Sequence, residues 1–268
     1  MRRAITQVQQ NHTDFLAQLE GEPNHCLIVR NEDPLSPYIV DYRRIDEPRT
    51  LKTKNRSGLS TFNLYSAIEP RFGPDERNLR HKQTELAKET LEFKAIEFQF
   101  RNTIGGAGQV HSILKLENKA IQANFLNELK KNFEKYPDKV PSQLIKLLFH
   151  GSKADPKLIY ESEEGLDIRR AAFGLAGQGI YFADTAAISN GYVGVQLQVD
   201  GQNLKSMFVC FVLPGESAEN PQNANQLRQP PNKPNSQELF DSVHMANRQH
   251  TVLYTNAKAY PAYLVRYT

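Results

Sequence analysis

The sequence contains no tryptophan, only two cysteines and no long apolar run. Cys26 and Cys210 lie far apart, which excludes a disulfide framework and a cysteine-based zinc site and is typical of a reducing compartment. No apolar stretch is long enough to span a bilayer, and polar residues follow Met1–Ala4 where a secretory signal would need an apolar segment. These absences predict an intracellular protein, cytoplasmic or nuclear, without membrane contact. A secreted effector that is delivered without such a signal stays open.

The chain also lacks a large excess of charge of one sign: 33 Lys and Arg residues face 30 Asp and Glu residues, which gives a formal net charge of +3. A dedicated nucleic-acid binder concentrates more basic charge on one face. The basic groups at Lys52, Lys54 and Arg56 and at Lys130-Lys131 are interpreted as solvated faces, so nucleic-acid contact stays open without being indicated. Hydrophobic residues make up 39% of the chain, which is enough for a sizeable core.

The chain changes character near residue 85. The first part, 1–85, combines an amphipathic start (5–19) with two strand-like runs, Cys26–Val29 and Tyr38–Val40, and polar connections. We assign it as an N-terminal region of unknown role. The remainder, 86–268, alternates helical and strand patterns and is predicted to form one domain of the α+β class.

Hydrophobic periodicity predicts the main elements of this second part. Phe93, Ile96 and Phe100 have helical spacing, and Gly105-Gly106 is expected to end that helix. From Val110 the pattern alternates as in a strand, with Leu114 and Leu116 predicted on the face of Val110, and His111, Ile113 and Lys115 on the other. Further expected elements are a helix with the stripe Phe125, Leu126, Leu129 and Phe133, a strand at 144–149, a core segment at Met207–Leu213 that includes Cys210, and a long loop at 214–236.

Two short apolar segments each carry one polar exception. Leu147–Ser152 contains His150, and Gly179–Ala183 contains Tyr181. Both read as buried strands, in which a histidine or a phenol hydroxyl is unexpected. The flanking glycines leave room for a ligand to approach the backbone closely.

Ser189 and Tyr192 follow at a spacing of three residues, on what is predicted to be a short helix after Asp184. In this order the motifs His-Gly-Ser, Gly-Ile-Tyr-Phe-Ala and Ser-x-x-Tyr resemble the catalytic domain of the poly(ADP-ribose) polymerase (PARP) family. The segments 239–243 and 258–265 resemble the last strands of its mono-ADP-ribosylating branch. The resemblance runs from about residue 90 to the C-terminus.

The resemblance implies an ADP-ribosyltransferase fold, with a split, mostly antiparallel sheet and flanking helices. It also implies NAD⁺ as co-substrate, no metal, and acceptor proteins as partners. A WWE-type ADP-ribose reader often precedes this domain, but the absence of tryptophan argues against one here. Residues 1–85 are also too few for the helical autoinhibitory domain of DNA-dependent members.

The resemblance also assigns roles at the site. Gly151 would pair through its backbone with the nicotinamide carboxamide, Ser189 would add a hydrogen bond, and Tyr181 and Tyr192 would sandwich the ring. His150 would orient the dinucleotide through a ribose. Alone, each of these residues is more often structural. The other residues expected to contact NAD⁺ are Ser152, Phe182, Ala183 and Arg169, with Arg170 as an alternative to Arg169 and a solvated surface role open for both.

One position departs from the family pattern. Polymer-forming members carry a glutamate eight residues before a glutamine, and here Lys258 stands for the glutamine and His250 for the glutamate. The catalytic set becomes His150, Tyr181 and His250. A carboxylate about 4 Å from the ribosyl cation gains roughly 4 kcal/mol at an effective dielectric near 20, and a neutral imidazole does not supply that charge.

The departure predicts mono-ADP-ribosylation of protein side chains and no polymer. A register error of one residue would place Gln249 or Thr251 there instead, and neither is acidic. Two alternatives stay open: a weak or inactive protein that binds NAD⁺ or ADP-ribose, and a transferase acting on nucleic acid. His244 and His250 are six residues apart, which suits no helical metal pair, so no metal site is predicted.

Overall fold

The computed structural model describes residues 25–29, 40–44, 68, 72, 74–106, 108–139, 141–199 and 201–268. In the N-terminal region, β1 (His25–Val29) and β2 (Val40–Arg44) pair antiparallel. The first matches the predicted strand, whereas the second lies mostly after the predicted Tyr38–Val40. The amphipathic segment 5–19 and the basic group at 52–56 lie outside the described residues.

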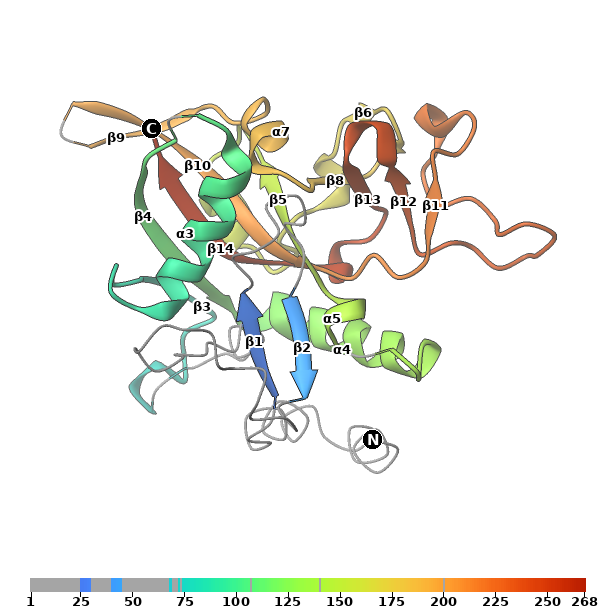
Figure 1. The fold of residues 1–268 in the computed structure, drawn as a ribbon, viewed down its shortest axis with the longest axis horizontal. Helices are drawn as coiled ribbons and strands as arrows, with labels where there is room; N and C mark the ends of the chain where they lie inside the picture. Colours follow the sequence, from blue (N-terminus) through green and yellow to red (C-terminus); the bar gives the residue numbers. More distant parts are fainter. Residues whose placement is uncertain are drawn as a thin grey trace, which may run out of the picture.

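The fold is α+β, as predicted, and is built on a large, mostly antiparallel sheet (Figure 1). The strand order is β11-β12-β13-β8-β5-β10-β14-β4-β3, and β9 pairs with β10. Among the described strands only β11 and β12 pair in parallel. The strands are β3 (His81–Glu85), β4 (Val110–Asn118), β5 (Lys146–Gly151), β8 (Ile180–Ala183), β9 (Val195–Val199), β10 (Gln202–Val212), β11 (Ser217–Glu219), β12 (Ser242–Met245), β13 (His250–Leu253) and β14 (Ala259–Tyr267), with a separate hairpin of β6 (Phe173–Gly174) and β7 (Gly177–Gln178).

Two longer helices follow the predicted periodicity. Helix α3 (Leu91–Ile104) begins where the Thr90 hydroxyl accepts the N–H of Phe93 and ends at Gly105, whose φ of 67° suits glycine. Helix α4 (Lys119–Lys135) is capped by Asn118, whose side chain accepts two backbone N–H groups. The shorter helices are α5 (Pro141–Leu144), α6 (Lys157–Tyr160) and α7 (Ala186–Asn190).

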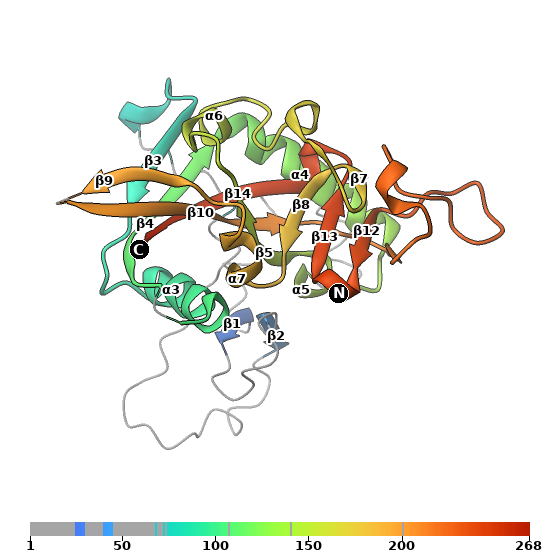
Figure 2. The ribbon, with the colours of Figure 1, turned by 90° about the horizontal axis from the view of Figure 1, so that it is seen from above.

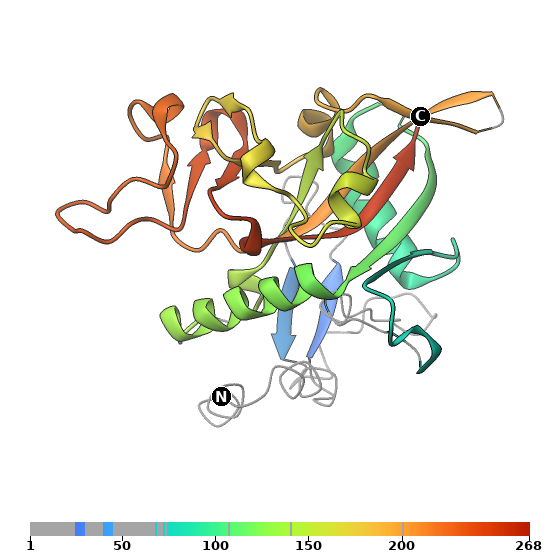
Figure 3. The ribbon, with the colours of Figure 1, turned by 180° about the vertical axis from the view of Figure 1, so that it is seen from behind.

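The core lies on both faces of the sheet. The buried stripes of α3 and α4 pack with Phe149 and Val209 on one face, and α6 packs with Leu148 and Cys210 on the other. Figure 2 shows α3 and α6 on opposite sides of β10 and β14, and Figure 3 shows the face that carries α6. Cys210 is a buried core residue, as predicted.

Some predicted boundaries were wrong. Helix α5 occupies the start of the strand expected at 144–149, so β5 begins at Lys146. In β4, Val110 packs with Ile113 rather than on the face of Leu114. The cause is a bulge: Tyr267 pairs with Val110 and Arg266 with Ser112, so His111 is an extra residue that reverses the alternation.

The sheet has a seam between β5 and β8. The two strands share one partner pair, Phe149 and Ala183, and then diverge. In a continued antiparallel ladder Gly151 would oppose Tyr181. Instead the carbonyl oxygen of Tyr181 forms a hydrogen bond with the imidazole of His150, 2.8 Å from its Nδ1. This is the split sheet that the resemblance predicted.

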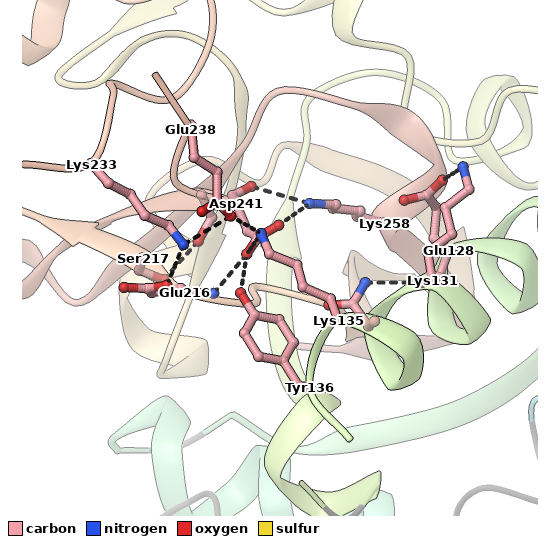
Figure 4. A network of polar contacts seen from close by, with 12 residues as sticks. Glu128, Lys131, Lys135, Tyr136, Glu216, Ser217, Lys233, Glu238, Asp241 and Lys258 are labelled. Carbon is pink, nitrogen blue, oxygen red and sulfur yellow. Dashed lines mark hydrogen bonds and ion pairs between the residues drawn. The ribbon is translucent and has the colours of Figure 1, made fainter. Parts of the chain in front are cut away.

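The connection from β10 to β12 is tied to the body by one carboxylate. The loop predicted at 214–236 contains a strand, β11, that polar composition did not reveal. Asp241 accepts hydrogen bonds from Lys135 at 3.0 Å, Lys258 at 3.1 Å, the backbone N–H of Glu216 at 3.0 Å and the Tyr136 hydroxyl (Figure 4). The network joins the end of α4 to both ends of the connection.

Candidate active site

A cavity of about 610 Å³ opens at the seam. This volume lies within the range of small-molecule sites. Strands β5 and β8, the residues around α7 and the segment 165–175 form its walls. Among its lining residues are His150, Gly151, Ser152, Lys153, Leu158, Asp167, Arg170, Phe173, Leu175, Tyr181, Ala183, Ser189, Tyr192 and His250.

His150 lies at the end of β5 and is held in one tautomer. Its Nδ1 is 2.8 Å from the Tyr181 carbonyl, which only accepts, so Nδ1 carries the hydrogen. Burial lowers the pKa of His150 below its ordinary value, with the hydrogen bond opposing the shift. The neutral ring therefore keeps an acceptor at Nε2, which suits a hydroxyl group of a ligand.

Gly151 lies where no side chain fits. A Cβ at this position would be 2.1 Å from the backbone oxygen of Ser189 on α7, well inside van der Waals contact. The Ser189 hydroxyl donates to the carbonyl of Phe149 at 3.1 Å, so α7 is bonded directly to β5. With its hydrogen used, Ser189 keeps lone pairs that can accept an amide N–H.

Two tyrosines border the cavity in different ways. The hydroxyl of Tyr181 accepts the N–H of Ala176 and donates to the carbonyl of Gly177, both at 2.8 Å, so its ring is fixed against the β6–β7 hairpin. Tyr192 is 56% exposed and follows the end of α7, rather than lying on the helix as predicted. An exposed phenol and a buried, hydrogen-bonded one thus lie at the same cavity, which offers aromatic faces to a flat ring.

His250 is the first residue of β13 and lies between the two phenols. Its ring is 6.2 Å from that of Tyr181 and 6.3 Å from that of Tyr192, edge-on to both. Burial lowers its pKa, an effect that Asp184 opposes and Arg248 reinforces. Nδ1 is buried and has no hydrogen-bond partner among the described residues. Since an unpaired buried N–H costs more than an unpaired lone pair, the hydrogen belongs on Nε2.

The structure brings most of the expected site residues together and places two of them elsewhere. Ser152 and Ala183 line the cavity, but Phe182 is fully buried and packs against the ring of His150. The side chain of Arg169 is 70% exposed and forms an ion pair with the lining residue Asp167 at 2.8 Å, but Arg169 itself is not among the lining residues. Arg170, the alternative considered, is the arginine that lines it.

Sequence reasoning missed the apolar rim of the cavity. Leu158, Phe173, Leu175 and Tyr192 are each more than half exposed, and all four line the opening. The only sequence signal for Phe173 and Leu175 is their position on either side of Gly174, where a Cβ would be 2.7 Å from the Tyr181 hydroxyl.

Among the described residues there is no group of three or more His, Cys, Asp or Glu side chains that could hold a metal. The helices described are also all too short or too polar to cross a membrane.

Comparisons with known proteins found a matching family and a similar protein. The sequence profile of the poly(ADP-ribose) polymerase catalytic domain matches residues 90–238. A probable poly [ADP-ribose] polymerase of Dictyostelium discoideum is 32% identical over 208 residues, which cover 75% of this chain. The matched region is 58% of the length of that relative.

Proposed function

The chain belongs to the poly(ADP-ribose) polymerase catalytic-domain family, and on this premise we propose that it transfers single ADP-ribose units from NAD⁺ to protein side chains. Nicotinamide would be released. One observation carries the proposal: a single cavity gathers His150, Gly151, Tyr181, Ser189 and Tyr192 from three separate segments of the chain.

The residues present fit NAD⁺ as the donor substrate. A carboxamide both donates and accepts hydrogen bonds, and it suits the acceptor at Ser189 together with the backbone of Gly151, which has no ladder partner on β8. The phenols of Tyr181 and Tyr192 suit its ring. Lys153 and Arg170 supply positive charge to the same cavity, as a diphosphate requires.

The absence of a free carboxylate supports transfer of single units. Among the described lining residues the only acid is Asp167, and its carboxylate is bonded to Arg169. In the proposed reaction the ribose–nicotinamide bond breaks, its electron pair leaves with nicotinamide, and the acceptor oxygen bonds to the ribose. Neutral His250 would donate a hydrogen bond from Nε2 without stabilising the cation by charge. An acidic acceptor brings its own charge, whereas a ribose hydroxyl acceptor would need a carboxylate both as a base and as a charge facing the cation, and the described lining residues offer no unpaired carboxylate.

Mass spectrometry after incubation with NAD⁺ tests the proposal. We expect ADP-ribose adducts of single units on the protein itself or on acceptor proteins, and a loss of about 100-fold in His150→Ala and Tyr181→Ala, the scale of a misplaced substrate. Chains of ADP-ribose would contradict the assignment of single-unit transfer. Adducts undiminished in both variants would show that the reaction uses another site.

A silent NAD⁺-binding protein is the second candidate, and it is favoured by the lack of an unpaired acid among the lining residues that the structure describes. Under this alternative, labelled NAD⁺ would bind with an affinity that His150→Ala weakens, while no label is transferred to any protein. Transfer to nucleic acid would instead give a label that nuclease removes and protease does not.

The transfer rate is expected to depend on pH below the ordinary histidine pKa. Burial holds the pKa of both His150 and His250 below 6.5, so both rings are neutral at pH 7. The rate, measured with saturating NAD⁺, should be flat from pH 8 to 6.5 and fall below it as the rings gain protons. In His250→Gln, the fall in rate at low pH should be limited to the part that arises from protonation of His150. A profile that falls between pH 8 and 7 would contradict the neutral state of these rings.

The free energy of unfolding, like the transfer rate, should decrease as the pH falls below 6.5. Because the unfolded chain takes up protons near pH 6.5 and the folded rings only at lower pH, acid favours unfolding. The contribution of both histidines is therefore fully present above pH 6.5 and is lost as the pH falls below it. Urea unfolding at pH 7 and pH 5, with His250→Gln as the comparison, measures the loss.

A further inference from the structure

Arg228 lies at the mouth of the cavity, on the connection between β11 and β12. Its guanidinium carbon is 4.9 Å from the centre of the Phe173 ring, and one of its N–H groups donates to the side-chain oxygen of Gln178 at 3.2 Å. Phe173 lines the cavity and is 54% exposed. An arginine that is stacked on a ring and bonded at its edge is oriented before any ligand arrives.

The backbone beside Arg228 is fixed to the same hairpin. The carbonyl of Leu227 accepts the N–H of Gln178 at 2.9 Å. A Cβ on Gly177 would be 1.9 Å from that carbonyl oxygen, and its φ of 71° also favours glycine. The position of Arg228 is therefore set by backbone contacts as well as by its own side chain.

The guanidinium of Arg228 is available to bind an anionic ligand. Among the described residues no carboxylate lies within ion-pair distance of its guanidinium, and only one of its five N–H groups is used. Asp167 is occupied by Arg169. Two other cations, Lys153 and Arg170, line the cavity itself, where a diphosphate would lie, whereas Arg228 lies outside the lining.

We propose that Arg228 recognises an anionic side chain of the acceptor protein, next to the residue that is modified. The inference rests on the proposed transferase function and adds a determinant of acceptor choice to it. The excess positive charge at the mouth is complementary to an acidic segment. The exposed rim of Leu158, Leu175 and Tyr192 offers apolar contact to the rest of that segment.

Two synthetic peptides test the inference. Each contains one glutamate as the modifiable residue, flanked either by cysteic acid, a permanent anion that forms no ester with ribose, or by lysine. The wild-type protein should modify the anionic peptide about five-fold faster at low peptide concentration, the scale of one partly exposed charge pair. Arg228→Glu should reverse this preference, and Arg228→Ala should abolish it.

The consumption of NAD⁺ with water as acceptor is the second readout. It should be unchanged in the Arg228 variants, since the donor cavity is left intact. Arg101→Glu, which makes the same charge change on the surface of α3, should leave both peptides as in the wild type. Equal preference in wild type and Arg228→Glu would overturn the inference, and so would a rise in the KM for NAD⁺ that accounts for the whole effect. A wild-type protein that neither binds nor consumes NAD⁺ would instead refute the proposed function.

Discussion

Replacing Gly151 by alanine is expected to reduce NAD⁺ consumption by about 100-fold, the effect of moving a reacting group by about 1 Å. The added Cβ would lie 2.1 Å from the Ser189 oxygen, so β5 or α7 must shift. Because Ser189 is bonded to Phe149 on the same strand, the shift would change the distance between the serine and the open backbone. Isothermal titration with nicotinamide or benzamide measures the loss of binding directly.

Gly191→Ala is the matched control for this prediction. Gly191 ends the same helix with an ordinary φ of −64°, and its nearest neighbour to an added Cβ is at 3.5 Å, a normal contact. It should retain wild-type binding and activity. We expect Gly151→Ala to lose about 1–3 kcal/mol of stability through overpacking, so the protein remains folded for the comparison. Normal benzamide binding by Gly151→Ala would move the nicotinamide subsite away from β5.

Asp241→Asn is expected to have the largest effect on stability, about 3–5 kcal/mol, because it removes one partner of a buried ion network. The carboxylate is only 10% exposed and accepts from Lys135, Tyr136, Lys258 and the N–H of Glu216. Burial alone would raise its pKa, but the bonds from Tyr136, Glu216 and Lys135 hold the pKa well below its ordinary range. An asparagine would present N–H groups to these donors.

Thermal unfolding measures the loss, which corresponds to a decrease in Tm of roughly 10 °C for a chain of this size. Glu163→Gln is the comparison, since Glu163 and its partner Arg80 are both highly exposed and such pairs contribute less than about 1 kcal/mol. Since the pKa of Asp241 is lowered, its contribution is present above pH 4 and is lost as the carboxylate gains a proton in acid. Equal Tm values for both variants would show that the network does not hold the connection.

The sequence predicted the parts of the fold that depend on local pattern. Helices α3 and α4 follow from their apolar spacing, and the end of α3 follows from Gly105, whereas the caps Thr90 and Asn118 were recognised only in the structure. The bulge at His111 was not predictable, because it depends on how β4 pairs with the last strand. Strand β11 was missed because three residues in a polar stretch carry no periodic signal.

In the site, too, the sequence predicted what depends on local pattern and missed what depends on tertiary contacts. The motif order indicated the two segments that carry His150 and Tyr181, and they lie on neighbouring strands. Alternation along β8 already directs Phe182 away from Tyr181, so its burial follows from strand geometry. Sequence could not decide between Arg169 and Arg170, because the outcome depends on Asp167, which bonds both the backbone and the guanidinium of Arg169.

The seam between β5 and β8 has a consequence for how the two halves of the sheet respond to a ligand. With one ladder pair between these strands, few backbone bonds resist a change in their separation. A ligand that bonds to Gly151 on one side and stacks on Tyr181 on the other would link β5 and β8 where ladder hydrogen bonds are absent. Saturating it should therefore raise the melting temperature and slow amide exchange on both sides of the seam at once.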